Sequence, residues 1–113
     1  MTAHRVKGNR IDLPSGKTAC FAFTVAEVVE VGDTLVVRLE VPPGAAMNRN
    51  VFGISAEDGR VLWQVPERNF VYEDSPYVGV RRDGDLLALY NWDGLKLRVV
   101  PQTGEVLEEL HGR

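Results

Sequence analysis

The sequence of 113 residues is short of the side chains that most often carry chemistry: it has one cysteine and two histidines. A single cysteine, Cys20, excludes an intrachain disulfide and a cysteine-rich zinc site. Both histidines, His4 and His111, lie near an end of the sequence, where we expect mobile side chains. Because a general base must be held in place, neither histidine suits that role. We therefore predict no catalytic residue, and a protein that is not an enzyme.

Patterns that bind phosphates, nucleic acids or metals are also missing. Lys and Arg number 13 against 16 Asp and Glu, which gives a net charge of -3 and argues against nucleic acid as a partner. Neither glycine-rich phosphate loop occurs in the sequence. Asp83 and Asp85 stand two residues apart but lack the further oxygen ligands of a calcium loop. We expect no cofactor and no metal ion.

Long apolar runs are absent as well. No run approaches the roughly 18 residues that a membrane-spanning helix needs, and the first residues carry no apolar signal region. With 44% hydrophobic and 26% charged residues, the composition suits one globular domain. We expect a cytoplasmic protein that does not enter a membrane.

What the sequence does have is turn signals every few residues, with short apolar runs between them. Glycine pairs such as Gly32-Asp33 and Asp83-Gly84 are typical of tight turns. Between turns, residues 35, 37, 39 and 41 are Leu, Val, Leu and Val, and residues 95, 97 and 99 are Leu, Leu and Val. This period of two places each set on one face of a strand. The pattern predicts an all-β fold of about ten antiparallel strands in meander order, stacked as sheets or closed into a barrel.

The glycines Gly16, Gly59 and Gly104 recur about every 45 residues within similar phrases. The upstream turns at Gly32 and Gly84 align in the same way. This spacing predicts two four-stranded repeats that resemble propeller blades, preceded by an N-terminal hairpin. The expected division is a flexible tail over 1–9 and a single all-β domain over 10–113. Within the domain, we place a half repeat at 10–24 and full repeats at 25–65 and 77–110.

These phrases resemble the quinoprotein-type (PQQ-like) β-propeller repeat, which has a Thr-Gly turn followed by a tryptophan. Gly59 and Trp63 match that motif, whereas Cys20 and Glu108 take the tryptophan position in the other two copies. The resemblance implies that Trp63 docks against a neighbouring blade. Two and a half copies fall short of the roughly four or more blades of a closed ring. We therefore do not carry quinone binding or dehydrogenase activity over to this chain.

Aromatic residues outside the expected strands are the remaining candidates for a site. Phe70 and Tyr72 lie in the stretch PERNFVYEDSP, residues 66–76, beside Arg68, and Trp92 lies in the turn NWDG. Aromatic and arginine side chains are enriched where proteins bind each other, although these aromatics could instead cap the end of a sheet. We predict a partner-binding surface formed by Arg68, Phe70, Tyr72 and Trp92.

The sequence leaves function open between two classes. The favoured hypothesis is a non-catalytic protein-protein interaction module, with a protein partner or self-association, because a truncated set of blades leaves strand edges or an apolar face unpaired. The alternative is a β-barrel that binds a small apolar ligand in its interior. The alternating Leu and Val sets, at residues 35–41 and 95–99, are large enough to fill such an interior, which favours the first hypothesis.

Overall fold

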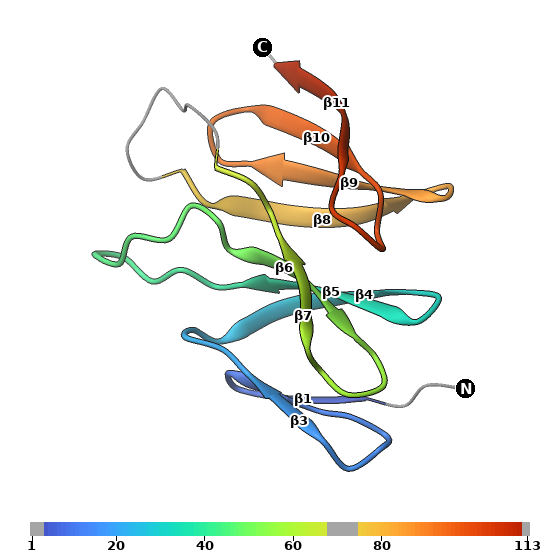
Figure 1. Ribbon diagram of the computed structural model, residues 1–113. Helices are drawn as coiled ribbons and strands as arrows, with labels where there is room; N and C mark the ends of the chain where they lie inside the picture. The colour runs from blue at the N-terminus through green and yellow to red at the C-terminus, as the bar shows by residue number, and fades with distance from the viewer. Residues whose placement is uncertain (1–3, 68–74, 112–113) are drawn as a thin grey trace.

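The structure is a computed structural model that describes residues 4–67 and 75–111, and this part of the chain contains eleven strands and no helix (Figure 1). The strands are β1 (Arg5–Lys7), β2 (Arg10–Asp12), β3 (Thr18–Cys20), β4 (Val25–Val31), β5 (Thr34–Leu39), β6 (Val51–Ser55), β7 (Val61–Gln64), β8 (Tyr77–Asp83), β9 (Leu86–Asn91), β10 (Leu95–Val99) and β11 (Val106–His111). The predicted all-β class and the meander order are confirmed.

The strands form three antiparallel sheets that follow the sequence order. The first sheet has the order β1-β2-β3, the middle sheet β4-β5-β6-β7, and the third sheet β11-β10-β9-β8. Figure 1 shows the three sheets stacked on one another, from the blue N-terminal sheet to the orange and red C-terminal one. The two four-stranded sheets are the predicted blade-like repeats, and the strands of the described residues do not close into a barrel.

The two blade-like sheets use the same turn glycines at the same places. Gly32 and Gly84 join the first strand to the second with φ of 58° and 62°, and Gly59 and Gly104 join the third to the fourth with φ of 80° and 74°. A positive φ strains any residue with a Cβ atom, which explains why glycine occupies these positions. The spacing that revealed the repeat is therefore a spacing of backbone turns.

Strand β5 is buried on both faces because it lies at the centre of the stack. Leu35, Val37 and Leu39 pack towards the first sheet. Val36, from the opposite face, joins the core between the middle and third sheets. The alternation in the sequence predicted the first set, but it did not distinguish Val36 from a half-exposed residue. A middle sheet has no solvent face, so its apolar residues need not alternate with polar ones.

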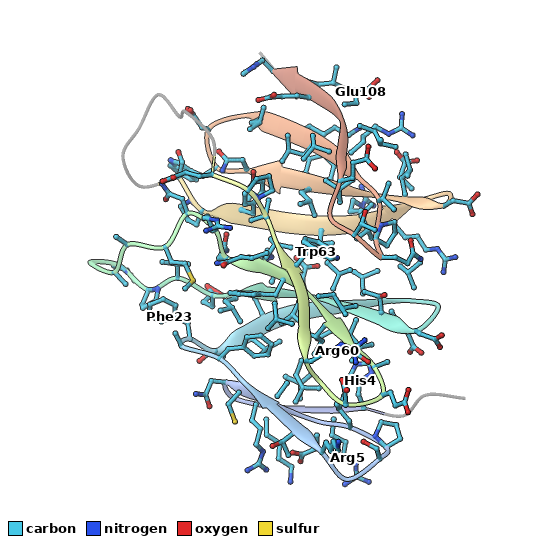
Figure 2. The ribbon with its side chains drawn as sticks, viewed as in Figure 1. His4, Arg5, Phe23, Arg60, Trp63 and Glu108 are labelled. Atoms are coloured by element: carbon cyan, nitrogen blue, oxygen red, sulfur yellow. The ribbon has the colours of Figure 1, made fainter. Side chains whose placement is uncertain are left out.

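Trp63 joins the middle sheet to the third (Figure 2). Its side chain is buried between the two sheets, and its Nε1 donates a hydrogen bond of 2.7 Å to the carbonyl oxygen of Pro101. The ring lies directly against Gly53 and Gly104, where a Cβ atom would overlap it. The docking role that the propeller resemblance implied for Trp63 is present in the structure.

The first sheet differs from the sequence prediction in two respects. Residues 5–7, which we expected within a loose tail over 1–9, form strand β1 and pair with β2, so the predicted hairpin is a three-stranded sheet. Strand β2 also pairs with β3 without the bulge of the other sheets, so Ile11 is opposite Ala19, and Cys20 points away from the core. Ala19, not Cys20, is the buried residue that approaches Gly59 of the middle sheet.

The two outer faces of the stack are charged. On the first sheet, Asp12 pairs with Arg10 at 2.9 Å. On the third sheet, Arg98 pairs with Asp83 at 3.2 Å and with Glu108 at 3.6 Å. Arg98 and Glu108 are opposite each other, as Gly53 and Trp63 are in the middle sheet. An ion pair thus stands where the third sheet would need a docking tryptophan to hold a further blade.

Candidate functional site

The connections between strands separate into two ends of the stack. In a meander, successive connections alternate between the ends, so the β1–β2, β3–β4, β5–β6 and β9–β10 connections share one end. We call this end the loop end and the opposite one the turn end. The β3–β4 and β5–β6 connections lie at the left in Figure 1, and the β4–β5 and β8–β9 turns at the right. The long β5–β6 connection, residues 40–50, belongs to the loop end.

Trp92 is held at the loop end with its side chain in solvent. It lies in the turn between β9 and β10, with 63% of its surface exposed. Its backbone N–H donates to the carbonyl of Pro76 at 3.0 Å. The buried Asn91 donates from Nδ2 to the carbonyl of Ser75 at 2.6 Å and accepts the N–H of Asp93 at 2.7 Å. The turn is therefore fixed by hydrogen bonds, while the indole does not cap the core.

Asn50 fastens the middle sheet to the third sheet next to this turn. Its side chain is 1% exposed and lies at the end of the β5–β6 connection. Its Nδ2 donates to the carbonyls of Leu39 and Tyr77 at 2.8 and 2.9 Å, and its Oδ1 accepts the N–H of Tyr77 at 2.7 Å. Buried amide groups with every partner in place restrict local motion. The β5–β6 connection and the start of β8 thus have a fixed spacing.

An open groove of about 380 Å³ lies between the β5–β6 connection and the Trp92 turn. Its lining is mostly apolar and consists of Val41, Pro42, Pro43, Gly44, Ala45, Met47, Asn48, Pro76, Val78 and Trp92. Val78, like Trp92, is largely exposed, at 49%. We call this the Trp92 groove. Exposed apolar surface gathered in a concave site is typical of binding sites.

The Trp92 groove adjoins a further hollow on each side. One, of about 420 Å³, shares Pro42 and also touches Gly8, Phe23 and Glu40. Phe23 is labelled at the left of Figure 2, at the same end of the stack as the β5–β6 connection. The other, of about 320 Å³, shares Met47 and Asn48 and extends to Glu67. The three hollows therefore adjoin one another through shared lining residues.

A family model covers almost the whole chain: residues 1–110 match a domain of unknown function, DUF7957. The chain belongs to the DUF7957 family. Its fold is similar to that of BamB from Moraxella catarrhalis, with a TM-score of 0.64 and 13% sequence identity. The match covers 96% of this chain and 32% of the BamB chain, so this DUF7957 domain spans about a third of BamB's length. The likeness supports a propeller-blade fold.

Two other comparisons support no conclusion about this chain. The computationally designed Ika8 protein is 10% identical, with a TM-score of 0.34 over 98% of this chain and 49% of that chain. None of the curated proteins matches this DUF7957 domain.

Of the four predicted site residues, Trp92 alone lies among the residues that the structure describes. Arg68, Phe70 and Tyr72 lie outside the described residues. The residues that flank them are described: Glu67 lines the smaller hollow, and Pro76 lines the Trp92 groove. Sequence reasoning missed the β5–β6 connection as a part of the site. Its composition, PPGAAM, signals a loop, but only the tertiary fold brings that loop opposite Trp92.

The described residues offer little beyond this groove for chemistry. They include no group of three or more His, Cys, Asp or Glu side chains that could hold a metal ion. His111 ends the exposed strand β11. The pKa of Asp58 is lowered because its carboxylate accepts the backbone N–H of Arg60, and this residue belongs to the β6–β7 turn at the turn end. Within the described ranges, no helix has the length and apolar character to span a bilayer.

Proposed function

We propose that this DUF7957 domain is a non-catalytic interaction module that binds a protein partner through its loop end. The observation that carries the proposal is Trp92, an exposed indole on a hydrogen-bonded turn beside an open apolar groove. Tryptophan is the residue type most enriched among binding hot spots. A large apolar side chain left in water stabilises a complex when it becomes buried there.

The rigidity of the Trp92 groove also supports binding there. Asn50 and Asn91 fix both walls of the Trp92 groove through buried hydrogen bonds. A surface that is already ordered loses less conformational entropy on binding. The segment 68–74 joins this surface in the proposal through Arg68, Phe70 and Tyr72, because Glu67 and Pro76 on either side of it line the hollows.

The test is affinity capture from the native cell with wild type and with a triple variant, Phe70→Ala, Tyr72→Ala and Trp92→Ala. Each truncation is expected to cost binding about 1 kcal/mol or more, or about fivefold in affinity. The matched control is Val6→Ala, which removes an exposed apolar group from β1, outside both the Trp92 groove and the edge strands β7 and β11. Equal capture by wild type and the folded triple variant, measured beside unchanged thermal unfolding, removes the proposal.

A second candidate, a site for a small apolar ligand, is favoured by the size of the Trp92 groove. About 380 Å³ lies within the range of small-molecule sites, which starts at roughly 300 Å³. The ligand would sit in this groove and not inside a barrel. Native mass spectrometry of the purified protein tests this: a bound small molecule that is absent from Trp92→Ala supports it, and a bare protein opposes it.

Self-association remains part of the proposal, through strand edges. The outer faces of the first and third sheets carry ion pairs, which are costly to bury without matching partners. The edge strands β7 and β11 expose the apolar side chains of Val61, Leu62, Leu107 and Leu110. Edge strands with exposed apolar side chains favour pairing with another chain.

A further inference from the structure

We propose that the loop end binds an extended peptide with an apolar centre and Lys or Arg residues on both sides of it. This inference rests on the proposed function and specifies its partner. It follows from two properties of the site, its continuous length and the sign of its charge.

The length comes from three hollows that share residues. Pro42 belongs both to the Trp92 groove and to the hollow that includes Glu40. Met47 and Asn48 belong both to the groove and to the hollow that includes Glu67. A ligand that passes around the β5–β6 connection therefore meets all three hollows in sequence. An extended chain fits a track of this kind, as in domains that dock proline-rich segments in aromatic-lined grooves.

The apolar centre follows from the middle of the track. Trp92 and Val78 are largely exposed on one wall, and Pro42 and Pro43 are exposed on the other. A peptide side chain placed between these walls loses contact with water on two sides. The hydrophobic gain for one fully buried Leu or Phe side chain is roughly 1.5–3 kcal/mol.

The basic flanks follow from the charges at the two ends of the track. Glu40 is exposed in one outer hollow, and Glu67 is exposed in the other. Asp93 follows Trp92 in the turn between them. Arg49 is the cation among the lining residues of the described track, and its Nε already donates to the carbonyl of Val65 at 2.8 Å. The track thus has a net negative charge, which attracts Lys and Arg and repels acidic peptides and phosphates. A cation that approaches Trp92 gains further from the face of the indole.

The test starts from a displayed library of random dodecapeptides selected on the immobilised wild-type protein. Peptides that also bind Trp92→Ala are removed. We expect the retained peptides to share an apolar core with Lys or Arg on each side. Fluorescence anisotropy then measures the affinity of one retained peptide, with labels placed outside the shared sequence.

Charge variants give the decisive comparison. Glu40→Gln and Glu67→Gln are each expected to weaken the retained peptide about two- to fivefold at low salt. Higher salt should reduce this difference, because it screens exposed charges. Glu57→Gln and Glu105→Gln, at exposed positions of the turn end, are the matched controls and should leave the affinity unchanged.

Two results would overturn the inference: no peptide retained, or retained peptides whose affinity does not respond to Glu40→Gln and Glu67→Gln. Its failure can be told apart from the failure of the proposed function. If capture from cells depends on Trp92 while no peptide is retained, the interaction module stands and its partner is a folded surface. If neither capture nor peptide binding depends on Trp92, both proposals are wrong.

Discussion

Trp63 shows how strongly the packing of the sheets depends on single glycine residues. Its ring fits between the middle and third sheets because Gly53 and Gly104 leave room for it. Its hydrogen bond to Pro101 then fixes its orientation. Gly104 therefore meets two requirements, a turn with positive φ and a close approach to the Trp63 ring. Gly84 meets only the first.

A comparison of Gly104→Ala with Gly84→Ala separates these two requirements. At Gly84 an added Cβ meets nothing within 4 Å, so the cost is the strain of a positive φ, about 1 kcal/mol. At Gly104 the Cβ would lie 2.6 Å from Cδ2 of Trp63. We expect an additional overpacking cost of about 1–3 kcal/mol there. Urea denaturation of both variants measures the difference, and equal destabilisation would contradict the close contact.

At the scale of elements, turns were predictable from the sequence and packing was not. The glycines of the β4–β5 and β8–β9 turns mark strand ends because few other residues accept a positive φ. The face of a side chain depends on register, which a single residue changes. The first sheet lacks the bulge of the other two, so Ala19 and not Cys20 faces the middle sheet. No local signal in the sequence reveals that difference.

The candidate site was predictable only in part, for a related reason. Trp92 was identifiable because a tryptophan in a four-residue turn has few residues around it to bury it. The opposite wall of the groove, from Pro42 to Met47, is some 45 residues away in sequence and meets Trp92 only through sheet stacking. Strand β1 was missed because its three residues, Arg5–Lys7, are all exposed and carry no apolar pattern.

Strand β5 gives the test at this scale, because both of its faces are in a core. Val36→Ala removes two methyl groups from a side chain with 0% exposure and should cost about 2 kcal/mol of unfolding free energy. Val61→Ala in β7, where the side chain is 56% exposed, should cost less than about 0.5 kcal/mol. Guanidinium denaturation of both variants provides the comparison. A small effect at Val36 would mean that the middle and third sheets do not pack as described.

At the scale of the whole molecule, charge decides which surfaces remain for a second chain. Arg98, Asp83 and Glu108 cover the outer face of the third sheet with ion pairs. The exposed Leu107 and Leu110 belong to the edge strand β11, as Glu108 does, and Leu110 is opposite Lys96. We therefore expect self-association to use the edge strand β11 with Leu107 and Leu110, and not the ion-paired part of the outer face.

Sedimentation velocity at micromolar concentration tests this expectation. Wild type should sediment as a species larger than 12.6 kDa, and the double variant Leu107→Lys and Leu110→Lys as a monomer. Introduced lysines on an edge strand oppose pairing through charge and hydration. A wild-type monomer would show that self-association is not part of the function. A variant that stays associated would place the contact elsewhere.

The central claim is that this DUF7957 domain binds its partner through the loop end, and hydrogen exchange of the complex tests it most directly. The captured partner is added to the wild-type protein, and amide exchange is compared with that of the free protein. The account predicts slower exchange in the β5–β6 connection, at Val78 and in the Trp92 turn, with little change in the β4–β5 and β6–β7 turns at the other end. Protection confined to the turn end or to the charged outer faces would contradict it.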